Sequence, residues 1–164
     1  MAPPMAIVNN ITRLLDARKV RYIAFETPPE KLGAFETAHF LNVPVETVFK
    51  TIVVTRTGPG KPFLALVPGN REVDLKLLAV VVGEKKVILP SEREAERLTG
   101  LQAGGISPLA LINRGFQVVI DDAAKSHTEI NVSGGQRGLN IRMPVEALVG
   151  LTNAQFAAIS RRAD

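Results

Sequence analysis

Residues Val48–Thr55 read VFKTIVVT and residues Phe63–Val67 read FLALV, with the turn Gly58-Pro59-Gly60 between them. β-Branched and apolar residues fill both runs, which predicts two strands joined as a hairpin. The second run is apolar at every position, so we expect it to be buried on both faces of a sheet. Lys50 is the exception in the hairpin, because the other residues on its face of the strand are β-branched.

Short helices and strands lie on both sides of this hairpin without a regular repeat. Helical spacing and capping residues predict helices over residues 5–19, 35–41, 74–82 and 91–98, and a last helix that carries Phe156 and Ile159 behind a Thr152/Gln155 cap. Further strands are expected over residues 22–25, 86–89, 117–121, 128–132 and 139–143. This order predicts a mixed α/β (α+β) fold, in which helices surround a mixed, mainly antiparallel sheet.

The composition is that of a globular protein. The 164 residues are 46% hydrophobic and 22% charged, and we expect one domain over residues 1–164. Because the chain has no Cys, it has no disulfide, thiolate zinc site or cysteine nucleophile. The N-terminus lacks the pattern of a signal peptide, and the longest apolar stretch, Leu77 to Val82, is shorter than the roughly 20 residues that span a bilayer. We therefore expect a soluble, cytoplasmic protein without a membrane partner.

The charge balance is moderately basic, with a net charge of +4 and a pI of about 9.7. Such a surface suits a polyanion, although a solvated surface of mixed charge explains it equally well. Aromatic residues make up only 5% of the chain, with one Tyr and no Trp. This content does not favour a stacking platform for single-stranded nucleic acid, and we expect no DNA partner.

Two glycine turns could carry chemistry. The first reads Gly104-Gly105-Ile106-Ser107-Pro108, and its glycine amides could together hold a carbonyl oxygen or an oxyanion. The second reads Ser133-Gly134-Gly135-Gln136-Arg137-Gly138, where Ser133 offers a hydroxyl and Arg137 a fork for phosphate. Each turn by itself equally fits an ordinary loop, and Lys50 by itself fits a lysine that protects an edge strand.

Other sites receive less support from the sequence. His39 and His127 make no metal-binding pattern, and no Gly-x-Ser-x-Gly nucleophile elbow is present. The segment Gly58-Pro59-Gly60-Lys61 lacks the spacing of a P-loop. Asp121 and Asp122 fit either a carboxylate pair or the turn at a strand end. We therefore expect neither a metal nor a cofactor.

Three motifs, taken in their order along the chain, resemble the motifs of a known protein family. Val48-Phe49-Lys50-Thr51, then Gly104–Pro108, then Val132–Leu139 resemble the YbaK family, the YbaK/prolyl-tRNA synthetase-associated group of freestanding editing domains. The resemblance covers about residues 7–162. It implies a mixed α/β fold with a curved central sheet, and the removal of a wrong amino acid from tRNA. The Gly-Gly-Ile-Ser-Pro form is similar to the branch that acts on Cys-tRNA, above all on Cys-tRNA(Pro), and the family can work alongside prolyl-tRNA synthetase.

The resemblance also assigns roles to residues. It maps the family's essential lysine onto Lys50, with Thr51 beside it, and the carbonyl-binding turn onto Gly104 and Gly105. It maps a pocket serine onto Ser133 and an aromatic pocket residue onto Phe25. The rest of the two turns is expected to help bind the substrate: Ile106, Ser107, Pro108, Gly134, Gly135 and Arg137.

Asn140 is the point at which the chain departs from the family pattern. The second turn of the family ends in Arg-Gly-Leu-Asp, whereas here it reads Arg137-Gly138-Leu139-Asn140. If the family aspartate pairs with the essential lysine, Lys50 lacks that counter-ion here. The change could also mark a different substrate.

The function expected from these features is that of an aminoacyl-tRNA deacylase. The glycine amides would hold the ester carbonyl, Lys50 would stabilise charge, and either water or the thiol of a cysteinyl substrate would attack. Two other classes stay open. One is a tRNA-binding module that keeps the pocket but has lost catalysis, which Asn140 motivates, and the other is a small-molecule binder unrelated to tRNA.

Overall fold

The fold is built on a mixed sheet of five strands in the computed structural model, which describes residues 7–163. The strand order is β5-β2-β3-β6-β9, with antiparallel pairing around β2 and parallel pairing of β6 with β3 and β9. The bounds are β5 (Val87–Ile88), β2 (Phe49–Arg56), β3 (Phe63–Pro68), β6 (Gln117–Asp121) and β9 (Gln155–Ala157). The predicted hairpin of the first two runs is confirmed as the antiparallel pair β2 and β3.

Two smaller sheets complete the strands of the described residues. One is antiparallel in the order β1-β8-β7, and the other pairs β10 with β4. Their bounds are β1 (Ile23–Glu26), β8 (Leu139–Pro144), β7 (Glu129–Ser133), β10 (Ser160–Arg162) and β4 (Arg71–Val73). A parallel bridge between Val48 and Asn131 joins the first of these sheets to the start of β2. The predicted mixed, mainly antiparallel α/β fold is confirmed, with its strands divided among these sheets.

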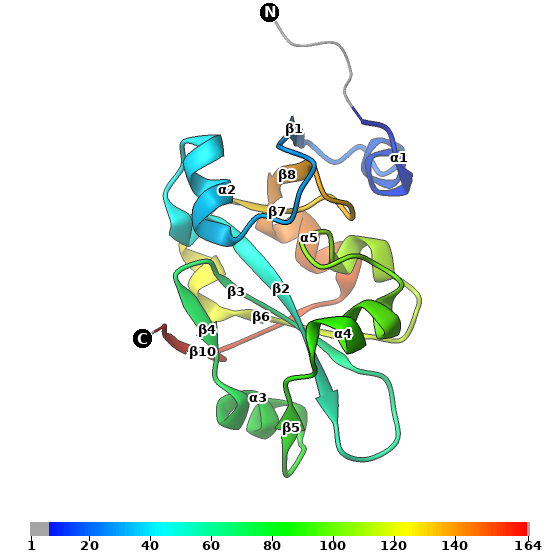
Figure 1. Ribbon diagram of the computed structural model, residues 1–164, viewed down its shortest axis with the longest axis vertical. Helices are drawn as coiled ribbons and strands as arrows, with labels where there is room; N and C mark the ends of the chain where they lie inside the picture. The colour runs from blue at the N-terminus through cyan, green and yellow to red at the C-terminus, as the bar shows by residue number, and fades with distance from the viewer. Residues whose placement is uncertain (1–6, 164) are drawn as a thin grey trace, which may run out of the picture.

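Short helices surround the sheets, and side chains cap them as the sequence predicts. They are α1 (Asn10–Ala17), α2 (Ala34–Leu41), α3 (Leu75–Val82), α4 (Glu92–Thr99) and α5 (Val145–Thr152), with 3₁₀ turns η1 (Val45–Thr47), η2 (Pro108–Leu111) and η3 (Asp122–Ser126). Asp74 accepts hydrogen bonds from the first amides of α3, and Ser91 accepts one from Glu94 in α4. In Figure 1, α1, α2 and the β1-β8-β7 sheet lie above β2, while α3 and β5 lie below it.

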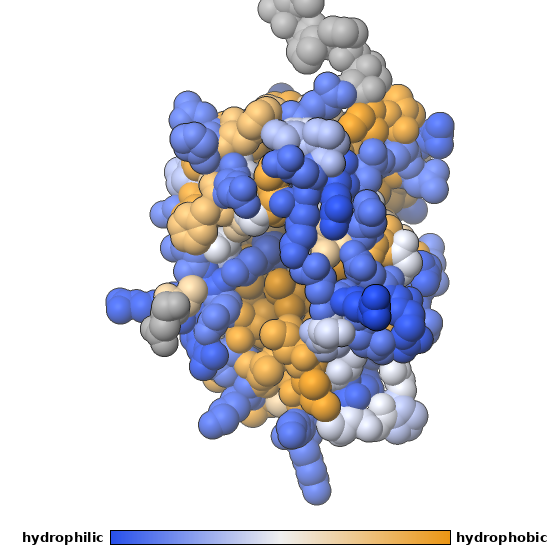
Figure 2. Space-filling view, in the orientation of Figure 1, coloured by the Kyte–Doolittle hydropathy of each residue, from blue (hydrophilic) through white to orange (hydrophobic). Residues whose placement is uncertain are grey.

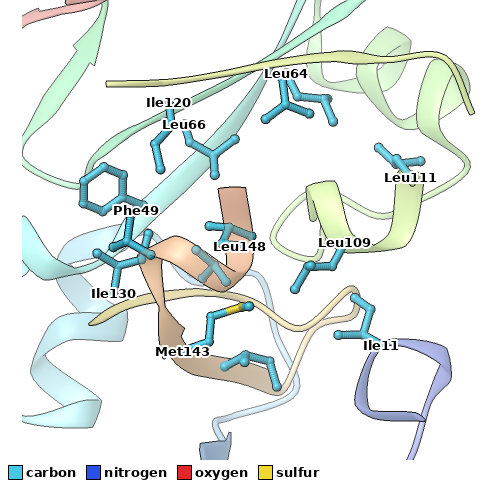
Figure 3. Close-up of a cluster of buried hydrophobic side chains, with 14 of the residues drawn as sticks. Ile11, Phe49, Leu64, Leu66, Leu109, Leu111, Ile120, Ile130, Met143 and Leu148 are labelled. Atoms are coloured by element: carbon cyan, nitrogen blue, oxygen red, sulfur yellow. The ribbon is translucent and has the colours of Figure 1, made fainter. Parts of the chain in front are cut away.

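The core lies on both faces of the five-stranded sheet, and alternation along β3 explains why. Leu64 and Leu66 point into a larger cluster with the β1-β8-β7 sheet, α1 and α5, where Met143 and Leu148 are fully buried (Figure 3). Phe63, Ala65 and Val67 point into a second cluster with α3. The expectation that this strand is buried on both faces is therefore confirmed.

The predicted last helix with Phe156 and Ile159 is wrong. Helix α5 ends at Thr152, Asn153 follows in the left-handed region with φ 56°, and the chain then extends into β9 and β10. A spacing of three residues fits one face of a helix, but here it carries Phe156 to one core cluster and Ile159 to the other. The predicted first helix is also shorter, with Asn9 as its N-cap, and residues 5 and 6 lie outside the described part of the chain.

Candidate functional site

A cavity of about 370 Å³ lies along one edge of β2. Every residue from Val48 to Val53 lines it, together with parts of α2, α4, the first glycine turn and the β7–β8 pair. The other lining residues are Lys31, Leu32, Gly33, Ala34, Thr37, Leu89, Pro90, Glu92, Ala95, Ala103, Gly104, Ile106, Ser133 and Asn140. The cavity thus draws together segments that are far apart in the sequence.

The edge of β2 explains why consecutive residues, rather than alternate ones, reach this cavity. On one side β2 pairs with β3 from Phe49 to Val54, whereas on the other it meets β5 only at Thr55 and Arg56. Across residues 50–53 no strand of the described chain is hydrogen-bonded to the second edge. Backbone and side chains of both faces therefore border the same space.

Lys50 is a half-buried cation in the cavity wall. It lies opposite Val67 of β3, on the same face of β2 as Ile52 and Val54. Desolvation by burial lowers the pKa of Lys50, and the negative charge of Glu72 on β4 acts in the opposite direction. Glu72 in turn accepts a hydrogen bond of 2.9 Å from Arg161 Nε on β10. Lys50 thus feels a carboxylate charge that comes from β4, not from position 140.

Two oxygen atoms in the cavity wall are buried without a hydrogen-bond partner among residues 7–163: Thr51 Oγ1 and Asn140 Oδ1. Asn140 is only 8% exposed and lies opposite Ser133 on β7 and Phe25 on β1. A buried oxygen without a partner costs free energy, and both of these oxygens belong to residues that line the cavity.

The first glycine turn presents Gly104 and Ile106 to the cavity, but Gly105 lies behind it. Gly104 has φ 89°, a conformation that favours glycine, whereas the amide of Gly105 donates a 2.8 Å hydrogen bond to the carbonyl of Gln102. Within the described residues the amides of Gly104 and Ile106 donate no hydrogen bond, so they are free to act as donors. In this conformation the pair of available amides is therefore Gly104 and Ile106.

The two glycine turns lie in direct contact. A Cβ added to Gly105 would come within 2.8 Å of Gln136 Cα, so only glycine fits there without a shift of the backbone. Arg137 Nε donates a 2.8 Å hydrogen bond to the carbonyl of Ala103, which ties the second turn to the first. The amide of Gly134 donates to Leu139, and that of Gly135 donates to Ser133 Oγ. Arg137 and these glycines therefore support the cavity wall from behind.

Three more of the predicted site residues lie beside the cavity without lining it. Ser107 is fully buried, and its Oγ accepts a hydrogen bond from Leu109 at the start of η2, which Pro108 begins. Phe25 is half-buried, and the Arg142 guanidinium lies over its ring, 4.7 Å from the centroid. These contacts hold the elements that carry Ile106 and Asn140.

The α2 side of the cavity was missed by the sequence reasoning. The segment from Lys31 to Ala34 approaches the first glycine turn closely, and a Cβ on Gly104 would lie 3.2 Å from Lys31 Cα. Lys31 also forms an ion pair with Glu92 at the start of α4. These contacts join residues about 60 to 70 positions apart, and no local pattern marks them.

Figure 2 shows an apolar surface below the centre, over α3 and β5. Leu89, which follows β5 in the sequence, is more than half exposed.

Asp121, another candidate from the sequence, has a structural role. Asp121 Oδ1 accepts a hydrogen bond from the amide of Ile159, and Oδ2 accepts one from Ala123, which fits the turn interpretation. Within residues 7–163, no group of three or more His, Asp or Glu residues is placed to hold a metal ion. None of the helices in that range is long and apolar enough to cross a membrane.

Comparison with known proteins identifies the family. The family model described as "Aminoacyl-tRNA editing domain" matches residues 28–151, which contain all of the lining segments. The chain belongs to this family. The resemblance to the YbaK group of editing domains is thereby confirmed.

Individual relatives agree with this assignment. The chain is 36% identical over 155 residues to the "Putative Cys-tRNA(Pro)/Cys-tRNA(Cys) deacylase EbsC" of Enterococcus faecalis, an alignment that covers 93% of each protein. It is 26% identical over 114 residues to the proline–tRNA ligase of Geobacter metallireducens, of which it spans only 19%. A solved structure described as a "putative trans-editing enzyme for prolyl tRNA synthetase" superimposes with a TM-score of 0.78 over 95% of this chain and 99% of that one. At 23% identity this last likeness shows the fold alone.

Proposed function

We propose that this protein is a trans-editing deacylase that removes cysteine from Cys-tRNA(Pro). The observation that carries the proposal is that one cavity is lined by Lys50, by Gly104 and Ile106 of the first glycine turn, and by Thr51 and Asn140, the two residues with an unpartnered buried oxygen. The family and the name of the Enterococcus faecalis relative support the substrate class. The cavity volume lies in the range of small-ligand sites, which suits an aminoacyl ester with its ribose.

Each part of the cavity has a task in this proposal. The amides of Gly104 and Ile106 hold the carbonyl oxygen of the ester and stabilise the negative charge that develops on it. The Lys50 ammonium binds the terminal ribose or phosphate and adds positive charge near the leaving oxygen. Thr51 Oγ1 and Asn140 Oδ1 accept hydrogen bonds from the ribose hydroxyls or the amino group of the substrate.

The attacking group is either water or the substrate's own thiol. If water attacks the carbonyl carbon, the ester C–O bond breaks, a proton moves to the ribose oxygen, and free cysteine leaves. If the thiol sulfur attacks, the same bond breaks, the thiol proton moves to the ribose oxygen, and a cyclic thioester leaves. Both routes rely on positioning and charge stabilisation, because an aminoacyl ester is already activated.

The test is deacylation of a panel of charged tRNAs by the wild-type protein, with and without added prolyl-tRNA synthetase. We expect Cys-tRNA(Pro) to lose its amino acid well above the spontaneous rate while Pro-tRNA(Pro) stays intact. Trapping of the released product separates free cysteine from the cyclic thioester. Binding of tRNA without deacylation of any member of the panel would contradict the proposal and assign the protein to the binding modules.

Asn140→Asp extends this test to the substrate choice. The carboxylate would add a negative charge to the wall of the cavity that Lys50 also lines. If Asn140 determines which charged tRNA is accepted, the variant changes the order of the deacylation rates across the panel. An unchanged ranking would show that position 140 does not select the amino acid.

A further inference from the structure

The outer face of α2 carries a second hollow, of about 400 Å³. Apolar and aromatic side chains make up most of its wall, and the lining residues are Pro28, Leu32, Phe35, Glu36, His39 and Phe40. Phe35 is 64% exposed and Phe40 is 53% exposed. Figure 2 shows apolar side chains over α2 at the upper left of the molecule. Two large rings exposed around one hollow indicate a binding surface.

These rings lie outside the hydrophobic core of the described residues. Phe35 and His39 are four residues apart, as are Glu36 and Phe40, so they form one outward stripe on α2. The buried residues of the helix, Thr37 and Ala38, lie on the opposite side. Neither Phe35 nor Phe40 belongs to either core cluster of the described residues. Their exposure therefore has no explanation in the packing of the chain.

The hollow adjoins the cavity along β2 that Lys50 lines, which is called the Lys50 cavity below. Leu32 lines both spaces, and the residues that follow it, Gly33 and Ala34, line the Lys50 cavity at the start of α2. An aminoacyl ester in that cavity would therefore have the outer face of α2 within reach of the nucleotides attached to it. The lining contains no Lys or Arg, so it suits the flat face of a base better than a phosphate. The one carboxylate, Glu36, already accepts a hydrogen bond from the Gly33 amide.

We propose that this hollow binds the unpaired bases next to the aminoacylated end of the tRNA, by stacking on Phe35 and Phe40. The inference rests on the proposed function, because it takes the aminoacyl group to lie in the Lys50 cavity. Stacking on an aromatic ring needs no particular base, so the site adds affinity for any tRNA with an unpaired 3′ end. A low aromatic content is sufficient for this, because two rings at the right place supply the platform.

The experiment compares two substrates in five proteins: wild type, Phe35→Ala, Phe40→Ala, Phe35→Tyr and Val80→Ala. The substrates are Cys-tRNA(Pro) and 3′-O-cysteinyl-adenosine, which lacks the preceding bases. Each Phe→Ala variant should lower kcat/KM for the charged tRNA about 10-fold to 100-fold and leave the nucleoside ester unaffected. Val80 is 80% exposed on α3, and its variant should match the wild type on both substrates. Phe35→Tyr, which keeps the ring, should retain most of the activity on the tRNA.

Three results would overturn the inference. One is unchanged activity of both Phe→Ala variants on Cys-tRNA(Pro), and another is an equal loss on the nucleoside ester. The third is a loss that occurs only after prolyl-tRNA synthetase is added, which would assign the hollow to a protein partner.

A separate binding measurement distinguishes failure of this inference from failure of the proposed function. An uncharged oligonucleotide with the tRNA 3′ end, in which 2-aminopurine replaces the nucleotide before the terminal adenosine, reports stacking by fluorescence without any deacylation. Quenching in the wild type that is lost in Phe35→Ala would support the stacking site even if no tRNA is deacylated. Equal signals in both proteins would overturn the stacking site even if the wild type is an active deacylase.

Discussion

Lys50 lies in the cavity wall with a pKa below the ordinary value of a lysine. Burial favours the neutral amine, and Glu72 restores part of the preference for the ammonium. Glu72 pairs with Arg161 of β10, the strand beside β4.

The first prediction concerns the titration of Lys50. NMR of its ¹³Cε nucleus should give a pKa below the ordinary value of 10.5, and Glu72→Gln should lower it further. If the ammonium is the active form, kcat/KM after subtraction of spontaneous hydrolysis falls as pH rises through this lowered pKa. The unfolding free energy rises with pH between the folded pKa and 10.5, because the unfolded chain binds more protons there. Glu84→Gln, which removes a partner of Arg56, is the control and should leave Lys50 unchanged.

The second prediction concerns the unpartnered oxygen of Thr51. Thr51→Val should raise the unfolding free energy by about 1 kcal/mol, because it removes a buried oxygen that has no partner, and it should lower kcat/KM. Thr99 is the matched control, since it is 1% exposed and its hydroxyl bonds Ala95 and Leu101. Thr99→Val should lower the unfolding free energy, measured by urea denaturation, by about 1–3 kcal/mol and leave kcat/KM unchanged. Loss of stability in Thr51→Val would show that its hydroxyl has a structural role.

At the scale of elements, the contact between the two glycine turns holds the cavity wall in place. Gly105 meets the backbone of Gln136, which lies in the turn between the paired residues Ser133 and Asn140. Gly105→Ala should therefore lower the unfolding free energy by about 1–3 kcal/mol and reduce deacylation. Gly58→Ala is the control, because an added Cβ there has nothing within 4 Å, and it should be neutral or slightly stabilising. Equal stability of the two variants in thermal unfolding would contradict the packing described for the turns.

The sequence predicts elements well where the pattern is local. The continuous apolar run Phe63–Val67 and the caps at Asp74 and Ser91 identify a strand and two helices, because each depends on neighbouring residues. Phe156 and Ile159 mislead, because parallel pairing with β6 decides the outcome, and that contact is 35 or more positions away. In the site, motifs identify Lys50 and the glycine turns, whereas the α2 wall follows only from tertiary contacts.

At the scale of the whole molecule, Asp121 connects the last strands to the central sheet. Its carboxylate accepts hydrogen bonds from the amides of Ile159 and Ala123, at the end of β6. Asp121→Ala should lower the unfolding free energy, measured by urea denaturation, by about 1–3 kcal/mol. It should also expose the β9 and β10 amides to hydrogen exchange. Asp122→Ala removes only an exposed pair with Lys125 and should change stability by less than about 0.5 kcal/mol. Similar losses of unfolding free energy in Asp121→Ala and Asp122→Ala would contradict this role of Asp121.

The measurement that tests the central proposal most directly is single-turnover deacylation of Cys-tRNA(Pro) by the wild type and by Lys50→Ala. Circular dichroism and thermal unfolding first confirm that the variant is folded, as expected for a half-buried side chain. The account predicts that the wild type deacylates this tRNA and that the variant is slower by about 10²-fold or more, because a preorganised charge has been removed from the cavity. A Lys50→Ala protein with the full wild-type rate would contradict it.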